Sequence, residues 1–131
     1  MLFTRNIYNS KNEQHNMLRN REDVQKEVDN LKEENTLCIV EGPKDKKALE
    51  ELGITNIMEL SKAPLYKIVE VAAATDDIVA ILTDTDEKGK ELYHVLFRDL
   101  QKHGVKVDNR LREKLFEQKI SHVEGLSKFL S

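Results

Sequence analysis

The sequence contains few of the residues that stabilise small secreted proteins or that anchor chains in membranes. Among 131 residues, one is cysteine, five are glycine and two are proline, and tryptophan is absent. A single thiol, Cys38, cannot form an internal disulfide, so we expect a reducing, cytoplasmic compartment. No apolar run approaches the length of a membrane span, and the first residues lack the apolar core of a signal peptide. We therefore expect a cytoplasmic protein without a membrane partner.

Charge is plentiful in the sequence but nearly balanced. Charged residues make up 34% of the chain, hydrophobic residues 39%, and the formal net charge is −3. This balance argues against a protein that holds nucleic acid by overall positive charge, although a local basic rim around an acidic site stays compatible with it. The length predicts one domain that buries a core without disulfides or a structural metal. Within that core we expect Cys38 to be a small buried hydrophobe rather than a nucleophile.

Apolar periodicity divides the chain near residue 36. Residues 1–15 are polar and aperiodic, whereas Val24, Val28 and Leu31 form a thin apolar stripe that predicts an amphipathic helix from about 16 to 34. We expect residues 1–35 to form a helical extension that packs on the domain or on a second subunit. Residues 36–131 are predicted to form the domain, which ends in a helical tail.

Strand and helix patterns alternate from residue 37 onward. Apolar runs predict buried strands at 37–40 and 78–82, and shorter strands are expected near 56–58 and 105–107. Helical patterns occupy the intervals: one starts at Pro43, others run from about 64 to 74 and from 87 to 103, and a short one follows Asp108. This alternation predicts an α/β fold, with a compact, Rossmann-like, four-stranded and mainly parallel sheet covered by helices on both faces.

Carboxylates follow both of the long predicted strands. Glu41 comes directly after the first strand, and Asp84 and Asp86 come directly after the third. If these strands are neighbours, the three side chains converge at the carboxyl edge of the sheet, where ligands of α/β proteins bind. Such carboxylates repel one another unless they are protonated or bridged by a cation. Oxygen ligands without nearby His or Cys favour Mg²⁺, with Mn²⁺ as the alternative.

Other motifs account less well for the acidic segment. An EF-hand would require an acidic or amide side chain where Lys88 stands and a glutamate where Val95 stands. The turn Glu41-Gly42-Pro43 lacks the glycines of a dinucleotide-binding site, and no nucleotide-triphosphatase phosphate loop is present. Helix capping stays open as the alternative explanation, because Asp and Glu are favoured near helix N-termini.

Two segments together resemble the Toprim domain: IVEGPKDKKAL at 39–49 and ILTDTDEKG at 81–89. That domain is shared by topoisomerases, bacterial-type primases, OLD-family nucleases, recombination mediators and the ribonuclease that matures 5S ribosomal RNA. The likeness covers about residues 36–118. The short chain looks like the small stand-alone Toprim proteins of archaea and some bacteria.

The resemblance assigns roles to residues of both segments. Glu41 matches the family's glutamate, which acts as a general acid or base and faces the metal. Asp84 and Asp86 match its Asp-x-Asp pair, which holds Mg²⁺ in the catalytic site. Gly42 and Gly89 match the glycines at which the family's backbone turns tightly.

Basic residues stand close to these motifs. Lys44, Lys46 and Lys88 are candidates to contact substrate phosphates, and Arg110, just after the last strand, is a candidate to close the site from one side. The alternative is that the lysines are solvated helix charges paired with neighbouring glutamates. His122 lies in a polar segment and shows no ligand spacing, so we expect no role for it.

These residues and the resemblance predict Mg²⁺-dependent action on the phosphodiester bonds of RNA or DNA, as in a small processing nuclease. A topoisomerase would need a catalytic tyrosine outside this domain and large gate domains, and a primase would need further modules. One alternative is a non-catalytic nucleic-acid-binding module, or a subunit that dimerises or joins a processing complex through the N-terminal helix. Another is phosphatase chemistry on a small phosphate ester, which uses the same carboxylates.

Overall fold

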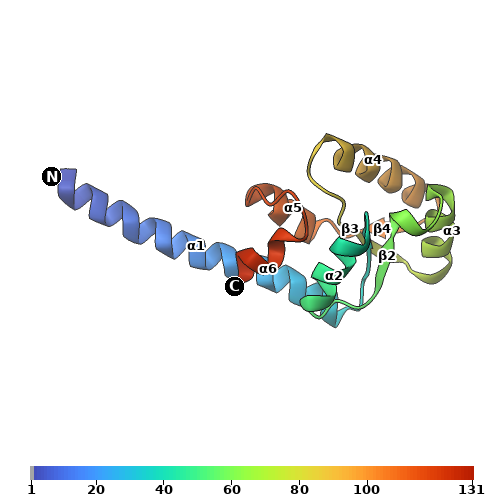
Figure 1. Ribbon diagram of the computed structural model, residues 1–131, viewed down its shortest axis with the longest axis horizontal. Coiled ribbons are helices and arrows are strands. Elements are labelled where there is room, and N and C mark those ends of the chain that lie inside the picture. The colour runs from blue at the N-terminus through green and yellow to red at the C-terminus, as the bar shows by residue number, and fades with distance from the viewer. Residues whose placement is uncertain (1) are drawn as a thin grey trace.

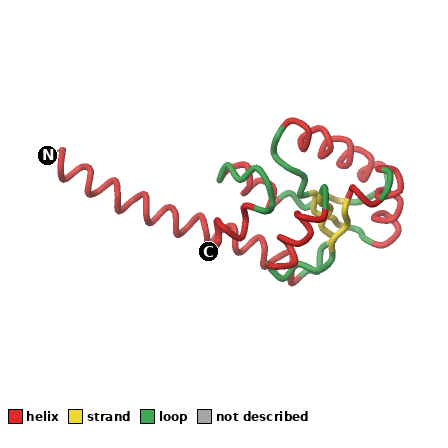
Figure 2. Tube along the Cα trace, in the orientation of Figure 1, coloured by secondary structure: helices red, strands yellow, loops and turns green. Residues whose placement is uncertain are grey.

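A parallel four-stranded sheet forms the centre of the protein (Figure 2). The computed structural model describes residues 2–131, with side chains from residue 13 onward, so the start of the predicted 1–35 extension lies partly outside the described residues. The strands are β1 (Leu37–Val40), β2 (Ile57–Glu59), β3 (Ile78–Ile81) and β4 (Lys106–Val107), in the spatial order β2-β1-β3-β4. All three pairings are parallel, which confirms the predicted α/β sheet.

Helices cover both faces of this sheet (Figure 1). One face carries α1 (Leu2–Glu33), α2 (Pro43–Glu51), α5 (Arg110–Glu117) and α6 (Gly125–Leu130), and the other carries α3 (Leu65–Thr75) and α4 (Glu87–Lys102). Alternate strand residues serve the two cores: Cys38 and Val40 join the first, whereas Leu37 and Ile39 join the second. Burial on both faces explains why β1 is apolar at every position.

The N-terminal helix is longer than the sequence predicts. It begins at Leu2, so the expected start near residue 16 was wrong. Among its described side chains, Val24, Val28 and Leu31 are buried in the first core, whereas Met17 and Leu18 are exposed. The N-terminal part of α1 projects from the α/β body (Figure 1). No helix in the described part of the chain combines the length and the apolar character needed to cross a membrane.

Candidate functional site

The two acidic motifs meet at the carboxyl edge of the sheet. Strands β1 and β3 are neighbours, with Ile39 paired to Ile81, so both strands end at the same level. Directly beyond them, Glu41 Oε2 accepts a hydrogen bond of 2.7 Å from the backbone N–H of Asp84, across 43 residues of sequence. The sheet topology therefore joins the two segments that are far apart in the sequence.

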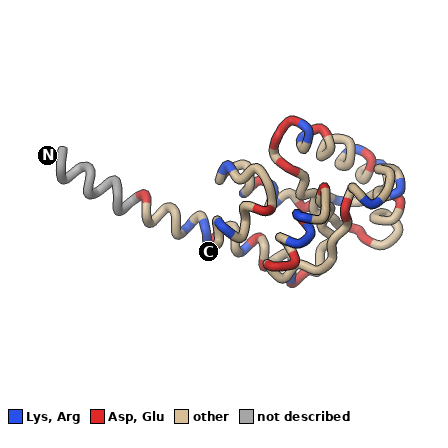
Figure 3. Tube along the Cα trace, viewed as in Figure 1, with Lys and Arg blue, Asp and Glu red and all other residues tan. Residues whose placement is uncertain are grey.

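These strand ends form one wall of an open cleft of about 760 Å³. Two of the lysines that the sequence nominated for phosphate contact, Lys44 and Lys88, lie in its lining. The complete lining consists of Glu41, Gly42, Pro43, Lys44, Asp45, Leu60, Ser61, Asp84, Lys88, Leu92, His122 and Glu124. Acidic residues also cluster on the loop that leads into α4 (Figure 3). The cleft thus combines carboxylates at its base with cations beside them.

Two aspartates of the motifs also bond to the N-terminal turns of helices. Asp86 is the N-cap of α4, and its Oδ1 accepts from the backbone N–H of Gly89 at 2.8 Å. Asp45, buried in the first turn of α2, accepts from the Gly42 N–H through Oδ2 at 3.1 Å. Asp86 and Asp45 therefore also stabilise the N-terminal ends of α4 and α2. Each bond uses one carboxylate oxygen and leaves the other outside the hydrogen bonds of the described residues.

Burial and the crowding of like charges raise the pKa of two carboxyl groups in this site, Glu41 and Asp45. Burial raises the pKa of Glu41, and the carboxylates of Asp84, Asp45 and Asp86 raise it further, while the hydrogen bond from Asp84 N–H acts in the opposite direction. Burial also raises the pKa of Asp45, again with a contribution from Asp84. The ionised forms of Glu41 and Asp45 are thus disfavoured, and a bound cation would relieve the repulsion that these two carboxylates experience.

Gly89 permits the close packing of the acidic loop against α4. A Cβ atom at this position would lie 1.8 Å from the backbone oxygen of Asp84, so no other residue fits without movement of the backbone. The loop is closed further by Thr83, whose hydroxyl donates to the Gly89 carbonyl at 2.7 Å. At Gly42, in contrast, the backbone is extended and an added Cβ would meet no atom within 4 Å. The packing of this chain therefore requires glycine at 89 and not at 42.

Arg112 holds the acidic loop in place through hydrogen bonds to its backbone. Its buried guanidinium donates to the carbonyl of Thr83 and, at 3.1 Å, to that of Asp84. The same group lies 4.6 Å from the ring centre of Tyr93 and 5.3 Å from that of Phe116. A guanidinium held between aromatic rings has few alternative positions, so it fixes the backbone that carries Asp84. Arg112 and Phe116 are on α5 and Tyr93 is on α4, so the sequence gives no signal for this contact.

His122, to which sequence analysis gave no role, reaches the site from the C-terminal tail. Its Nδ1 lies 2.9 Å from Asp84 Oδ1, and this contact raises the pKa of the imidazole. The adjoining backbone is tied to the same loop, because the Thr85 N–H donates to the Ser121 carbonyl at 2.9 Å. The apolar residues of the tail indicate its buried side but not the element that it meets, so only the tertiary structure brings His122 to the carboxylates.

Two basic residues that the sequence nominated for the site, Lys46 and Arg110, lie outside the acidic cleft. Lys46 lines a separate hollow beside β2 and α3 rather than the acidic cleft. Arg110 is bonded to carboxylates at the junction of α1 and α5: its Nη2 lies 2.8 Å from Asp108 Oδ2 and 3.2 Å from Glu34 Oε2. Neither residue is among those that line the cleft with Glu41.

Comparison with known proteins identifies the family. The model of the Toprim domain matches residues 35–109, more than half of the chain, including all four strands and both acidic motifs. The chain belongs to the Toprim family. At the family level, a Toprim domain binds Mg²⁺ through acidic residues and acts on nucleic acid.

This Toprim chain is similar in sequence to archaeal proteins and similar in structure to a bacterial one. It is 37% identical over 100 residues to a UPF0292 protein of Thermococcus onnurineus, covering 76% of this chain and 74% of the relative. A UPF0292 protein of Pyrococcus abyssi is 39% identical over 89 residues, covering 67% of each chain. A solved structure of a protein from Aquifex aeolicus has a TM-score of 0.70 and 29% identity, covering 74% of this chain and 92% of that one.

The acidic loop of the Toprim domain offers a donor set that fits a magnesium ion. Of its two aspartates, Asp84 lines the cleft, whereas Asp86 caps α4 and is not among the lining residues. Among the described residues, no group of three or more His, Cys, Asp or Glu side chains is arranged to enclose a metal ion. Mg²⁺ in phosphate chemistry needs less, because one or two carboxylates hold it while water and substrate oxygens complete its shell. Asp84 and Asp86 each keep one oxygen that takes part in none of the described hydrogen bonds, which meets this smaller requirement.

Proposed function

We propose that this Toprim protein is a Mg²⁺-dependent nuclease that hydrolyses phosphodiester bonds in RNA or DNA. The observation that carries the proposal is the 2.7 Å hydrogen bond between Glu41 and the backbone of Asp84, which joins the two motifs in one cleft. A proton-transferring carboxylate and a metal-binding pair at one strand edge are the minimal equipment for metal-assisted phosphodiester hydrolysis.

In this proposal, Asp84 and Asp86 hold the ion. Bound Mg²⁺ would polarise a phosphoryl oxygen and offset the charge that develops on the phosphate. Glu41 is oriented by the bond from Asp84 N–H to its Oε2, and its Oε1 takes part in no hydrogen bond among the described residues. That second oxygen is available to exchange a proton with the attacking or departing oxygen of the substrate.

Lys44 and Lys88 are proposed to bind the substrate's phosphates. Both line the cleft, and neither is part of an ion pair among the described residues. The open space above Gly42 lets a phosphate approach the backbone closely between them. Positive side chains around an acidic centre counter the repulsion between the carboxylates and a polyanionic substrate.

The test is cleavage of structured RNA, single-stranded DNA and duplex DNA in the presence of Mg²⁺. We expect Asp84→Asn and Glu41→Gln each to lower the rate by about a hundredfold or more, the usual contribution of a metal ligand or proton-transfer group. Asp77→Asn and Glu50→Gln are matched controls, because both residues are exposed and lie outside the cleft lining. Cleavage that survives both cleft substitutions at the wild-type rate would refute the proposal.

A second candidate is a module that binds nucleic acid without cleaving it. It is favoured by the contact of His122 with Asp84, which occupies one oxygen of a carboxylate that the nuclease would use to hold the ion. Binding that requires Mg²⁺ and Asp84, measured without any product over many hours, would select this alternative over the nuclease.

A further inference from the structure

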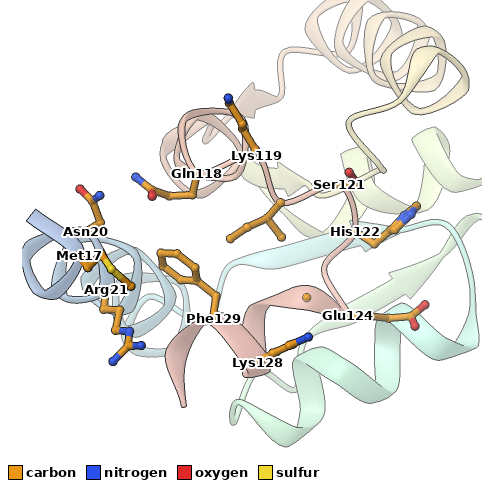
Figure 4. A pocket seen from close by; sticks show the side chains of 12 residues that line it. Met17, Asn20, Arg21, Gln118, Lys119, Ser121, His122, Glu124, Lys128 and Phe129 are labelled. Carbon is orange, nitrogen blue, oxygen red and sulfur yellow. The ribbon is translucent and has the colours of Figure 1, made fainter. Parts of the chain in front are cut away.

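A second cleft adjoins the acidic one between the N-terminal helix and the C-terminal tail (Figure 4). It has a volume of about 520 Å³ and lies largely outside the segment that matches the Toprim domain. Its walls come from α1, from the loop between α5 and α6, and from α6 itself. The lining includes Met17 and Arg21 of α1, Lys119, His122 and Glu124 of the loop, and Lys128 and Phe129 of α6. We call this hollow the tail cleft.

The tail cleft shares two lining residues with the acidic cleft. His122 and Glu124 line both hollows, so these two residues lie where the clefts adjoin. This boundary is anchored to the acidic loop through the bond from Thr85 to the Ser121 carbonyl and through the contact of His122 with Asp84. A chain bound at the carboxylates therefore meets the tail cleft next.

The charge of the tail cleft is opposite to that of the acidic cleft. Arg21, Lys119 and Lys128 contribute three cations, and Glu124 is the one acidic side chain among the lining residues. None of the three cations belongs to an ion pair among the described residues. In Figure 4, Lys119 and Lys128 stand on opposite sides of the opening. Such unpaired cations around one hollow favour a polyanion.

The floor of the tail cleft is apolar and includes an aromatic ring. Phe129 lies between α1 and the tail in Figure 4, and Met17 beside it is 55% exposed. A flat ring flanked by cations is the arrangement with which proteins bind single-stranded nucleic acid, because bases stack on the ring while phosphates meet the cations. An apolar peptide would use the ring but would leave the three cations without partners.

We propose that the tail cleft binds the single-stranded nucleotides that flank the scissile phosphate, with a base stacked on Phe129 and phosphates at Arg21, Lys119 and Lys128. This inference rests on the proposed function, because it assigns the neighbouring part of the same substrate. It gives the N-terminal helix and the C-terminal tail, which lie outside the matched Toprim segment, a common role in substrate binding.

The experiment measures binding of fluorescent single-stranded oligonucleotides, one of DNA and one of RNA with the same sequence, by anisotropy. Glu41→Gln serves as the background in Mg²⁺, so that no strand is cleaved. We expect Arg21→Ala/Lys119→Ala/Lys128→Ala to weaken binding at least tenfold and to reduce the slope of log affinity against log salt by about 2, since each lost phosphate contact removes about 0.7. Phe129→Leu is expected to weaken binding about tenfold without changing that slope.

The matched control is Lys102→Ala/Lys106→Ala, which removes two exposed lysines that line neither cleft. It should bind as the Glu41→Gln background does, and circular dichroism should show all variants folded. The DNA and RNA arms identify the strand type: a tighter RNA complex means that the cleft reads the ribose hydroxyl, and equal affinities mean that it reads phosphate and base alone. Both support the proposal.

Failure of this inference is distinguishable from failure of the proposed nuclease activity. Hydrolysis of bis(p-nitrophenyl) phosphate, which is too short to span both clefts, should persist in the triple variant with the wild-type residue at Glu41. Unchanged oligonucleotide binding by the triple variant overturns the inference, even if the wild-type chain is a nuclease. Loss of self-association in sedimentation, without loss of oligonucleotide binding, also overturns it, because the cleft would then be an interface between copies.

Discussion

Replacement of Gly89 by alanine tests whether the acidic loop is held by close backbone packing. The new Cβ would lie 1.8 Å from the Asp84 oxygen, whereas Cβ atoms essentially never approach within 3.0 Å, so the loop and helix must separate by at least 1.2 Å. The obstructing atom belongs to the backbone, so no side-chain rotation relieves the clash. Two bonds lie on this path: Arg112 Nη2 to Asp84 O at 3.1 Å and Gly89 N–H to Asp86 Oδ1 at 2.8 Å.

The magnitude depends on the bonds that this displacement breaks. Loss of a hydrogen bond from a charged donor costs about 1.5–3 kcal/mol, and loss of the helix cap costs about 1 kcal/mol. Alanine's better helix propensity returns at most about 1 kcal/mol. We therefore expect Gly89→Ala to lower the free energy of unfolding by about 2–4 kcal/mol, and Tm by about 8–15 °C.

Gly42→Ala is the matched control, because the same atom added there meets nothing within 4 Å and the backbone is extended. Thermal and urea unfolding of both variants, followed by circular dichroism without added metal, measure the difference. The control should stay within about 0.5 kcal/mol of the wild type. If Gly89→Ala is as stable as Gly42→Ala, the loop is not constrained in the way that the packing indicates.

Three further predictions concern the same loop and its surroundings. Arg112→Met should cost about 2–4 kcal/mol in urea unfolding, because two loop carbonyls lose their buried donor; a loss under about 1 kcal/mol would argue against its supporting role. The hydrogen bond from Arg110 lowers the pKa of Asp108, so this carboxylate stabilises the fold above its unfolded pKa and loses that effect as pH falls through the lower folded value. Asp108→Asn should therefore lower Tm near neutral pH and flatten its decline in acid; parallel curves would contradict this. Mg²⁺ at a hundred times its Kd should stabilise the wild type by about 2.7 kcal/mol and so raise its Tm, whereas the Tm of Asp84→Asn should not change. Equal rises in Tm would place the ion elsewhere.

The sequence by itself determined the layout of the sheet and the identity of its acidic ends. Strand β1 matches its predicted bounds, and β3 is one residue shorter than predicted. The agreement is close because a short continuous apolar run is typical of a strand buried on both faces. The structure places Glu41 and Asp84 in one cleft, since neighbouring parallel strands bring the residues after them to one edge of the sheet, and it places Asp86 at the start of α4. Their roles stay a prediction. The start of α1 was missed, because residues 1–15 have no regular apolar spacing in the sequence.

Only the tertiary structure decided which other side chains surround those carboxylates. Arg110 and Arg112 are two residues apart and indistinguishable by pattern, yet Arg110 pairs with Glu27 on α1, whereas Arg112 donates to the acidic loop. His122 comes from the C-terminal tail, far from the motifs in the sequence, and its neighbours line a second cleft against the N-terminal helix. Periodicity records how each element faces its own core, whereas these contacts join elements distant in the chain. The sequence therefore determined the acidic centre, and the packing of the two ends of the chain decided what surrounds it.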